Sequence, residues 1–519
     1  MITRLMVVFV VMNVLAMSAF AESPHVSYIF PAGGQRGAEV SYKVGGHYLH
    51  EGCPFEMIGP GVSASARIER TKTVWFEGPL IPQPASQRKE DYPNDYLGSV
   101  KIAKGAPLGF RRWRVNTSQG VTSRMKFVVG DLPEVTEEEI DGEPIPTSVQ
   151  LPVTINGRIF PREDVDIWTF DAEAGKRISC EVNAARIGSP LDSRIEIRGP
   201  DGSVLTENVD ALGVDSFVQF VAPKAGRYEC RIHDIEFGGL QHYVYRLTIR
   251  KGPYLKSVYP LGGQRGDSVR FQLSGTDLPM NQANVEIPKN SARQFNLSLP
   301  NVASNNVTLV AGKLPEHLEV EPNDATDSVK PEAVSLKSGM VFNGRIDKPG
   351  DIDLFRFSAE VGKTLLLEVQ SSRLGTELDS VLSVLSSDGK QLKLNDDLAG
   401  GIPDSRVVWK VPNGESFFAQ IRDQFDHRGG SRFAYRISIS EVSEQHFELK
   451  LPLDTVNIGQ GAETKLKISI DRSFGFKGEV ELSAEDLPDG VTAEPVRIAK
   501  NRQDAQLVIK VDESATPQI

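Results

Sequence analysis

One part of this chain is written twice, and the second copy follows 187 residues after the first (343 − 156 = 187). The tetrapeptide Asn-Gly-Arg-Ile occupies 156–159 and again 343–346. The same spacing still separates Asn208 from Asn395, so no loop between these points changes its length. A repeat of this length indicates a duplicated structural module, and each candidate function has to be read in both copies.

A second duplication precedes each copy of the first. The pentapeptide Gly-Gly-Gln-Arg-Gly stands at 33–37 and at 262–266, a spacing of 229 residues (262 − 33 = 229). The chain is therefore predicted to alternate two kinds of module, with one further unit at its end. After a leader at 1–21, the expected boundaries are 22–130, 131–252, 253–313, 314–443 and 444–519.

The residue pattern within the modules is typical of strands. Apolar and polar residues alternate in short runs such as 167–170, 363–369 and 435–439, and glycine-containing turns separate these runs. No amphipathic pattern long enough for a helix of three turns occurs after the leader. We expect an all-β protein made of tandem β-sandwiches.

The leader and the charge balance indicate the compartment and exclude some partners. Residues 1–21 combine Arg4, an apolar stretch and a small-x-small end at Ala19 and Ala21, which is the pattern of a secretion signal. We therefore expect a secreted, periplasmic or cell-surface protein. A net charge of −11 without a basic cluster argues against nucleic acid and against anionic lipid. No later apolar run is long enough to insert into a membrane.

Three cysteines leave one disulfide possible. Cys180 and Cys230 both lie in alternating, strand-like segments, and their counterparts in the second copy are the apolar Leu367 and Ala419. Both cysteines are therefore expected to point inward, either as a disulfide or as two buried thiols. Cys53 has no further cysteine with which to pair.

One acidic constellation stands just ahead of and inside the second copy. In an extended segment, residues two apart share a face, so Glu319, Glu321 and Asn323 can point in one direction. A second two-apart pair follows at the start of a strand. If the two pieces meet, they offer the oxygen-only ligands that calcium prefers; otherwise they form a solvated acidic linker. The candidate metal ligands are Glu319, Glu321, Asn323, Asp324, Asp351 and Asp353.

The first copy keeps only part of this constellation. Ile140 replaces the proline of the second copy, and Gly142 replaces Asp324. The corresponding acidic residues are Glu137, Glu139, Asp141, Asp164 and Asp166. We expect a weaker metal site in the first copy.

A further acidic group in the second copy allows two interpretations. Asn395, Asp396 and Asp397, together with Asp404, form either another cation-binding loop or an ordinary polar loop.

The duplicated segments resemble bacterial pre-peptidase C-terminal domains, which are β-sandwiches appended to secreted peptidases and collagenases. The resemblance covers 153–249 and 341–439. It rests on the Asn-Gly-x-Ile motif, the Asp-x-Asp pair ahead of Phe170 and Phe357, an Asp-Gly turn and the closing Tyr-Arg pair. Less closely, the Gly-Gly-Gln-Arg-Gly modules resemble Ig-like folds of the IPT/TIG type, and the last unit is similar to Ig-like modules that accompany secreted hydrolases. The arrangement is similar to large exported proteins of planctomycete-type bacteria.

This resemblance implies a metal and argues against catalysis. Collagen-binding members of the family hold calcium through a similar Glu-x-Glu-Pro-Asn-Asp segment together with aspartates of the sandwich, which favours calcium at 319–324. None of these module families is itself catalytic, and no zinc-protease, serine-hydrolase or phosphate-loop motif occurs. We therefore expect no catalytic residues and a non-catalytic extracellular protein that binds a polysaccharide or protein or acts as a spacer. The alternative is the accessory region of a larger secreted peptidase or other hydrolase.

Overall fold

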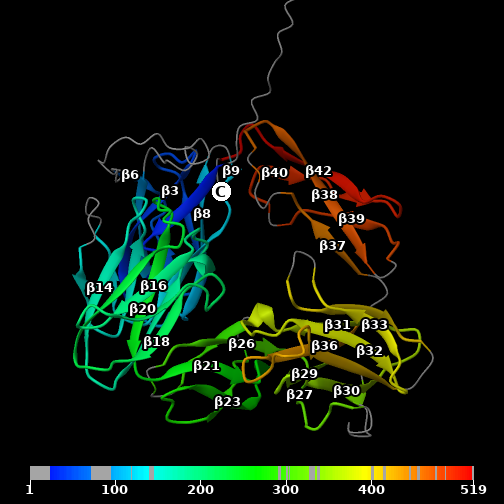
Figure 1. Ribbon diagram of the computed structural model, residues 1–519. Coiled ribbons are helices and arrows are strands. Elements are labelled where there is room, and N and C mark those ends of the chain that lie inside the picture. Colours follow the sequence, from blue (N-terminus) through cyan, green and yellow to red (C-terminus); the bar gives the residue numbers. More distant parts are fainter. Residues whose placement is uncertain are drawn as a thin grey trace, which may run out of the picture.

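The structure is a computed structural model, and it is nearly all β (Figure 1). The expectation of tandem β-sandwiches is confirmed. The expected leader at 1–21 lies outside the described residues. In the part of the chain that the structure describes, no helix is long and apolar enough to cross a membrane. The described residues are 24–71, 95–117, 120–138, 145–289, 294–299, 302, 304–325, 334–335, 339–398, 402–412, 416–442, 446–452, 456, 458–473, 476–485 and 487–516.

The first module consists of two sheets that pack face to face. One sheet contains β1 (His25–Phe30), β3 (Glu39–His47), β7 (Asp95–Ile102), β5 (Val62–Ala64) and β6 (Glu69–Thr71). The other contains β2 (Gly33–Gln35), β10 (Met125–Gly130), β8 (Gly109–Thr117), β4 (Phe55–Ile58) and β9 (Gly120–Val121). Trp113, Tyr28 and Tyr42 are fully buried between them, which gives this module a large aromatic core.

The second and fourth modules have the same strand order. In the second, one sheet runs β11 (Glu134–Thr136), β13 (Val153–Arg158), β20 (Val244–Lys251), β15 (Arg177–Asn183) and β18 (Phe217–Val221). The other runs β12 (Thr147–Ser148), β14 (Asp166–Ala172), β19 (Gly226–Asp234), β16 (Ser193–Arg198) and β17 (Val204–Asn208). A short 3-10 helix, η1 (Ala185–Ile187), follows β15.

The fourth module repeats this arrangement strand by strand. Its sheets are β27 (Glu316–Leu318), β29 (Met340–Arg345), β36 (Ala434–Val442), β31 (Thr364–Gln370) and β34 (Arg406–Lys410), and β28 (Val334–Ser335), β30 (Ile352–Ser358), β35 (Phe417–Asp423), β32 (Ser380–Ser386) and β33 (Gln391–Asn395). The 3-10 helix η2 (Ser372–Leu374) stands where η1 stands in the second module. The sequence duplication is therefore a duplication of topology.

The third and fifth modules are smaller. The third pairs β21 (Tyr254–Tyr259), β23 (Ser268–Thr276) and β24 (Gln282–Glu286) in one sheet, and β22 (Gly262–Gln264), β26 (Val307–Gly312) and β25 (Gln294–Leu297) in the other. The fifth has a four-stranded sheet of β37 (His446–Lys450), β38 (Glu463–Ser473), β42 (Asp504–Val511) and β40 (Val491–Ala493). Its second sheet holds only β39 (Val480–Leu482) and β41 (Val496–Ile498).

Close packing explains the repeated Gly-Gly pair. A Cβ on Gly34 would lie 2.5 Å from the Val40 side chain, and one on Gly263 would lie 2.6 Å from that of Val269. Such distances are far below van der Waals contact, so only glycine lets β2 and β22 approach the facing strand. The motif is thus a packing requirement of the first and third modules.

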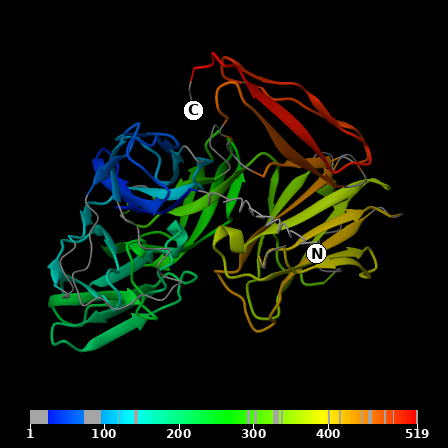
Figure 2. The same ribbon diagram turned by 90° about the horizontal axis from the view of Figure 1, so that it is seen from above.

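The first module is in direct contact with the second and the third (Figures 1 and 2). The core of the first module includes Ile187 and Val244 from the second, and both views show the first module, in blue, against the cyan and green second module. The third module also reaches the first, because the side-chain nitrogen of Asn296 donates to the carbonyl of Leu108 at 2.8 Å. The first three modules therefore share contacts beyond their covalent links.

Candidate metal site

The candidate ligands of the second copy lie on two segments that the backbone holds together. The amide of Glu319 donates to the carbonyl of Asn343 at the end of β29. The amide of Leu354 in β30 donates to the carbonyl of Asn323 at 3.2 Å. These two bonds fix the linker between the third and fourth modules across the ends of β29 and β30. The linker and the first residues of β30 consequently meet, as the sequence pattern required for a metal site.

Three carboxylates converge at this point. Ligand oxygens of Glu319, Glu321 and Asp353 all lie within 4.8 Å of one another. Oxygens that bind one calcium ion at about 2.4 Å are at most about 4.8 Å apart, so these three fit around a single ion. Asp353 is fully buried, Glu319 is half-buried and Glu321 is exposed, which leaves the cluster open to solvent on the side of Glu321.

The side-chain amide of Asn323 adds a fourth polar group. It lies 3.2 Å from Oδ1 of Asp353 and 3.3 Å from Oε1 of Glu321. With its nitrogen toward these carboxylates, the amide donates to both of them; with its oxygen toward them, it places a fourth acceptor among them. The same residue can therefore serve the cluster with or without a cation.

Surrounding donors orient two of the carboxylates. The Tyr435 hydroxyl donates to Oδ2 of Asp353 at 2.6 Å. The Tyr259 hydroxyl lies 2.8 Å from the carbonyl of Asn343 and 3.1 Å from Oε1 of Glu319, so these two acceptors share its one proton. The amide of Arg345 donates to Oε2 of Glu319 at 2.9 Å. Tyr259 belongs to β21 of the third module, so the cluster is in contact with the module that precedes it.

The other two candidates form a neighbouring pair. The Lys348 ammonium lies 3.6 Å from Oδ2 of Asp324 and 3.6 Å from Oδ1 of Asp351. Oδ2 of Asp351 accepts the amide of Asp347 at 2.6 Å. The structure thus places four of the six predicted residues at the centre and gives Asp324 and Asp351 a cationic partner beside it.

The acidity of the central carboxyls reflects this crowding. Burial, followed by the negative charge of Glu319, raises the pKa of Asp353 to about 9. Burial also raises the pKa of Glu319 to about 8. The pKa of Glu321 is raised by burial and by the nearby carboxylates of Asp351 and Asp324. The protein therefore holds these groups where negative charge is poorly compensated by its own residues.

The first copy has the corresponding hydrogen bonds to its carboxylates, but fewer of its candidate ligands lie in the described residues. Oε2 of Glu137 accepts the amide of Arg158 at 2.8 Å, and the Tyr245 hydroxyl donates to Oδ2 of the buried Asp166 at 2.6 Å. Oδ2 of Asp164 accepts the amide of Phe160 at 3.1 Å. Glu139 and Asp141 lie outside the described residues.

The residue at the position of Tyr259 differs between the two copies, and this difference affects the candidate metal site. Phe30 precedes Pro31 where Tyr259 precedes Pro260, so the first copy lacks the hydroxyl that contacts Glu319. The stacking on this ring is the same in both copies, because the guanidinium of Arg158 lies 5.0 Å from the centre of the Phe30 ring and that of Arg345 lies 5.0 Å from the centre of the Tyr259 ring.

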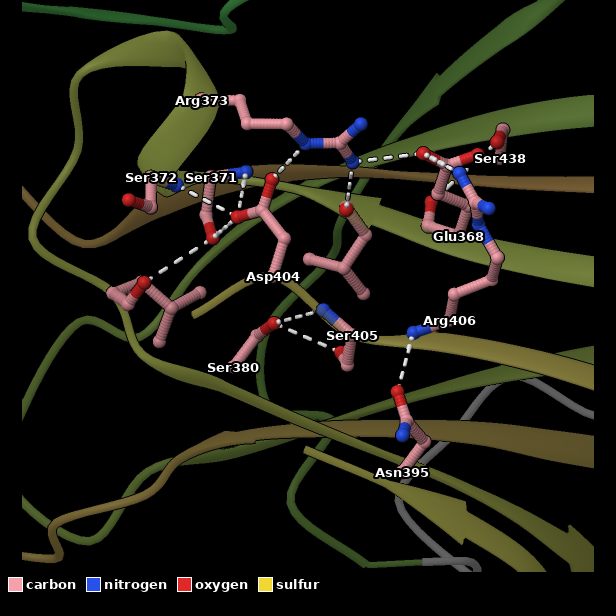
Figure 3. A network of polar contacts seen from close by, with 12 residues as sticks. Glu368, Ser371, Ser372, Arg373, Ser380, Asn395, Asp404, Ser405, Arg406 and Ser438 are labelled. Carbon is pink, nitrogen blue, oxygen red and sulfur yellow. Dashed lines mark hydrogen bonds and ion pairs between the residues drawn. The ribbon is translucent and has the colours of Figure 1, made fainter. Parts of the chain in front are cut away.

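Asp404 belongs to a structural network rather than to the loop at Asn395–Asp397 (Figure 3). Its fully buried carboxylate accepts the amides of Ser371 and Ser372 at 3.0 and 2.8 Å, and it pairs with the guanidinium of Arg373. Asp215 and Arg186 do the same at η1 in the second module, at 2.7 Å. Comparing the two copies could have revealed this network, because Asp215 and Asp404 both precede a serine and both copies keep the arginine.

All three cysteines are buried free thiols. The sequence allowed either a disulfide or two buried thiols at Cys180 and Cys230, and the structure has the two thiols. A hydrogen bond between them, followed by burial, raises the pKa of Cys180.

Comparison with known proteins identifies part of the second module. Residues 164–234 match the family model of the bacterial pre-peptidase C-terminal domain. The chain contains one such domain. The matched region begins at Asp164 and ends with Asp234 at the end of β19, so it covers the middle of the second module.

The individual relatives match only parts of the chain or match it weakly. A probable subtilase-type serine protease of Deinococcus radiodurans is 41% identical over 66 residues, which is 12% of this chain and 9% of that protein. The chain thus spans about a tenth of that relative. The pre-peptidase C-terminal domain of a Bacillus anthracis collagenase aligns over all of its length and 21% of this chain, with 18% identity and a TM-score of 0.18. A Bacteroides ovatus glucan-locus protein, SGBP-B, aligns over 81% of this chain and 75% of its own, with 10% identity and a TM-score of 0.16.

Proposed function

We propose that this protein is a non-catalytic, exported modular protein that binds or spaces extracellular partners, and that calcium fixes the linker ahead of its fourth module. The proposal of a metal site rests on the convergence of Glu319, Glu321 and Asp353, whose oxygens lie within 4.8 Å of one another. Hard, oxygen-only ligands at this spacing suit calcium better than the transition metals, which prefer nitrogen or sulfur.

Calcium would act on the angle between modules. Glu319 and Glu321 come from the linker, Asp353 comes from the fourth module, and the Tyr259 hydroxyl that contacts Glu319 comes from the third. An ion held by the first three would tie the linker to the sandwich and keep Glu319 in place for Tyr259. The positive charge would also compensate carboxylates that the surrounding residues leave crowded.

The modular assignment extends the family match. The fourth module has the same strand order as the second and keeps the Asp-x-Asp pair, which supports a second pre-peptidase C-terminal domain. The first and third modules, with their Gly-Gly-Gln-Arg-Gly turns, would be Ig-like units between these domains, and the fifth a further one. Such an array suits a binder or spacer of polysaccharide or protein.

The two copies should differ in metal affinity. In the first copy, Glu137, Asp164 and Asp166 accept hydrogen bonds like those of the corresponding carboxylates in the second copy. Phe30, however, stands in place of Tyr259, and Ile140 stands in place of Pro322. We infer that the site of the fourth module binds calcium more tightly than that of the second.

A second candidate function is the accessory region of a larger secreted peptidase. It is favoured by the local identity of 41% to a probable subtilase-type serine protease. Reading the gene beyond codon 519 tests this alternative, since a peptidase domain in the same reading frame would support it and a stop codon would contradict it.

Calcium titration by calorimetry and thermal melting tests the main proposal. Wild-type protein should bind calcium and melt at a higher temperature; an ion at 100 times its dissociation constant adds about 2.7 kcal/mol. The double variant Glu321→Gln with Asp353→Asn should lose the tight binding and the shift. Asp388→Asn, at an exposed turn, is the matched control and should behave as wild type. Equal calcium responses in all three proteins would contradict the proposal.

A further inference from the structure

The fifth module leaves one edge of its larger sheet uncovered. Within the described residues, β37 pairs with β38 alone and ends the order β37-β38-β42-β40 (Figure 1). The opposing sheet has only β39 and β41, and its core cluster includes no residue of β37. An edge strand with unpaired backbone groups is a template for another strand unless the protein protects it.

The uncovered strand carries its apolar residues on the core side of the sheet. Leu449 stands opposite Ile470, which is only 5% exposed and belongs to the core of this module. Residues two apart share this face, so Phe447 and Leu449 line it together, and Leu451 follows directly after the strand. They are nonetheless 36%, 42% and 55% exposed. Phe447 stacks on Phe476 with 5.0 Å between ring centres, and Leu449 leaves much of the rest of this face exposed at the edge.

The opposite face of β37 carries one charge of each sign. Glu448 and Lys450 flank Leu449, and Pro452 follows two residues after Lys450. Glu448 stands directly opposite Asp471 of β38, which places two acidic residues side by side. Lys450 bonds to Asp471 at 2.9 Å.

The sequence of β37 is complementary to a second, antiparallel copy of itself. If a second copy of β37 lies antiparallel with the two Leu449 residues opposite each other, Glu448 of each copy faces Lys450 of the other. On the other face, Phe447 of each copy then faces Leu451 of the other. Each attractive pair occurs twice, as two-fold symmetry requires. A register shifted by one residue would bring charged residues opposite apolar ones.

We propose that β37 is a homodimerisation edge at which two copies of this chain join their fifth modules into one continuous antiparallel sheet. The occupant of the open edge is thus a second copy, and the charge complementarity of Glu448 and Lys450 sets the register. This inference is independent of the calcium site, which lies in the linker between other modules.

Sedimentation equilibrium with charge-swapped variants tests this proposal. Wild-type protein should show a concentration-dependent monomer–dimer equilibrium. Glu448→Lys alone, or Lys450→Glu alone, turns two attractive pairs into two repulsive ones and should weaken dimerisation at least roughly tenfold. The double swap Glu448→Lys with Lys450→Glu restores opposite charges across the symmetry axis and should return the constant to within roughly threefold of wild type.

A control separates this effect from misfolding and from net charge. Glu494→Lys makes the same charge change at an exposed position outside β37 and should leave dimerisation unchanged. Melting temperatures of the single swaps should remain close to that of the double swap when extrapolated to dilute protein. A wild-type protein that stays monomeric at high concentration, or a double swap that dimerises no better than the single swaps, would overturn the proposal.

Discussion

The Tyr435 hydroxyl passes over Gly344, and this contact explains why the Asn-Gly-Arg-Ile motif is repeated. A Cβ on Gly344 would lie 2.3 Å from Oη of Tyr435 and 2.8 Å from Oε2 of Glu319. Gly157 has the same relation to Tyr245, at 2.3 Å. The motif thus leaves room for the tyrosine that orients the buried aspartate. The glycine serves the candidate metal site without supplying a ligand.

Substituting this glycine should therefore damage both stability and metal binding. We expect Gly344→Ala to lower the free energy of unfolding by about 1–3 kcal/mol, as overpacking of a core does, and to weaken calcium binding by displacing Glu319. Urea titration and calorimetry measure the two effects. Gly105→Ala is the control, because nothing lies within 4 Å of a Cβ at Gly105. A Gly344 variant as stable as the Gly105 variant would contradict this account.

His242 makes stability depend on pH near the junction of the first two modules. Burial, followed by the charge of His25, lowers the pKa of His242 from 6.5 to about 4. His25 in turn faces His47 across β1 and β3, and Ser189 contacts the backbone carbonyl of His242. The folded state therefore favours the neutral imidazole, whereas the unfolded chain takes up a proton below about pH 6.5.

The sign of the pH effect follows from this difference. The stability contributed by the neutral form should be complete above about pH 6.5 and should be lost progressively as the pH falls toward about 4, with an upper limit of about 3 kcal/mol. Denaturation curves between pH 4 and 7 for wild type and His242→Gln measure it. The variant should show a shallower decline, and identical pH profiles for the two proteins would contradict the assignment.

At the scale of elements, a buried aspartate holds each 3-10 helix against its sandwich. Asp404 accepts the amides of Ser371 and Ser372 and pairs with Arg373, all at the start of η2. Removing one partner of a fully buried ion pair typically costs about 3–5 kcal/mol. The cost should be smaller here, because the Arg373 side chain is 31% exposed and also pairs with Glu368 at 2.8 Å.

The consequence is a large loss of stability from a single-atom change. We expect Asp404→Asn to lower the free energy of unfolding by about 2–4 kcal/mol, because the amide keeps one acceptor but loses the charge that faces Arg373. Chemical denaturation followed by circular dichroism measures this. Asp388→Asn, on an exposed turn, should change stability by less than about 0.5 kcal/mol. Comparable effects from both substitutions would refute the structural role of Asp404.

Much of the strand content could be predicted from sequence, because period-two alternation reports directly which residues face a core. The shared face of Glu319 and Glu321 was predictable from their two-apart spacing. Their meeting with Asp353 was left open by the residues and was favoured only by the resemblance to the pre-peptidase C-terminal family. The role of Asp404 was not predictable from its own segment. Its partners lie about thirty residues away, and only the fold brings them together. The edge strand β37 escaped prediction for the same reason, because alternation does not reveal whether the opposing sheet covers a strand.

For the whole molecule, the second and fourth modules are built alike on the side that meets the preceding module. Arg246 pairs with Glu134 at 2.7 Å, and both side chains are almost fully buried. Arg436 pairs with Glu316 in the same way in the fourth module. Asn156 and Asn343 donate to these glutamates at 2.8 and 2.9 Å. Each ion pair therefore lies within its own module and links the module's first strand, β11 or β27, to β20 or β36. Both arginines border the preceding module, since a Cβ on Gly33 would lie 2.2 Å from Nη1 of Arg246 and one on Gly312 would lie 3.3 Å from Nη2 of Arg436.

The central claim is that calcium binds where this linker meets β30, and a crystal structure of the protein grown with terbium in place of calcium tests it most directly. The anomalous difference map should show one strong peak between Glu319, Glu321, Asn323 and Asp353, at about 2.3–2.6 Å from their oxygens. A weaker peak or none should appear beside Asp166. A map without a peak at the Glu319 cluster, or with its main peak elsewhere in the molecule, would contradict the claim.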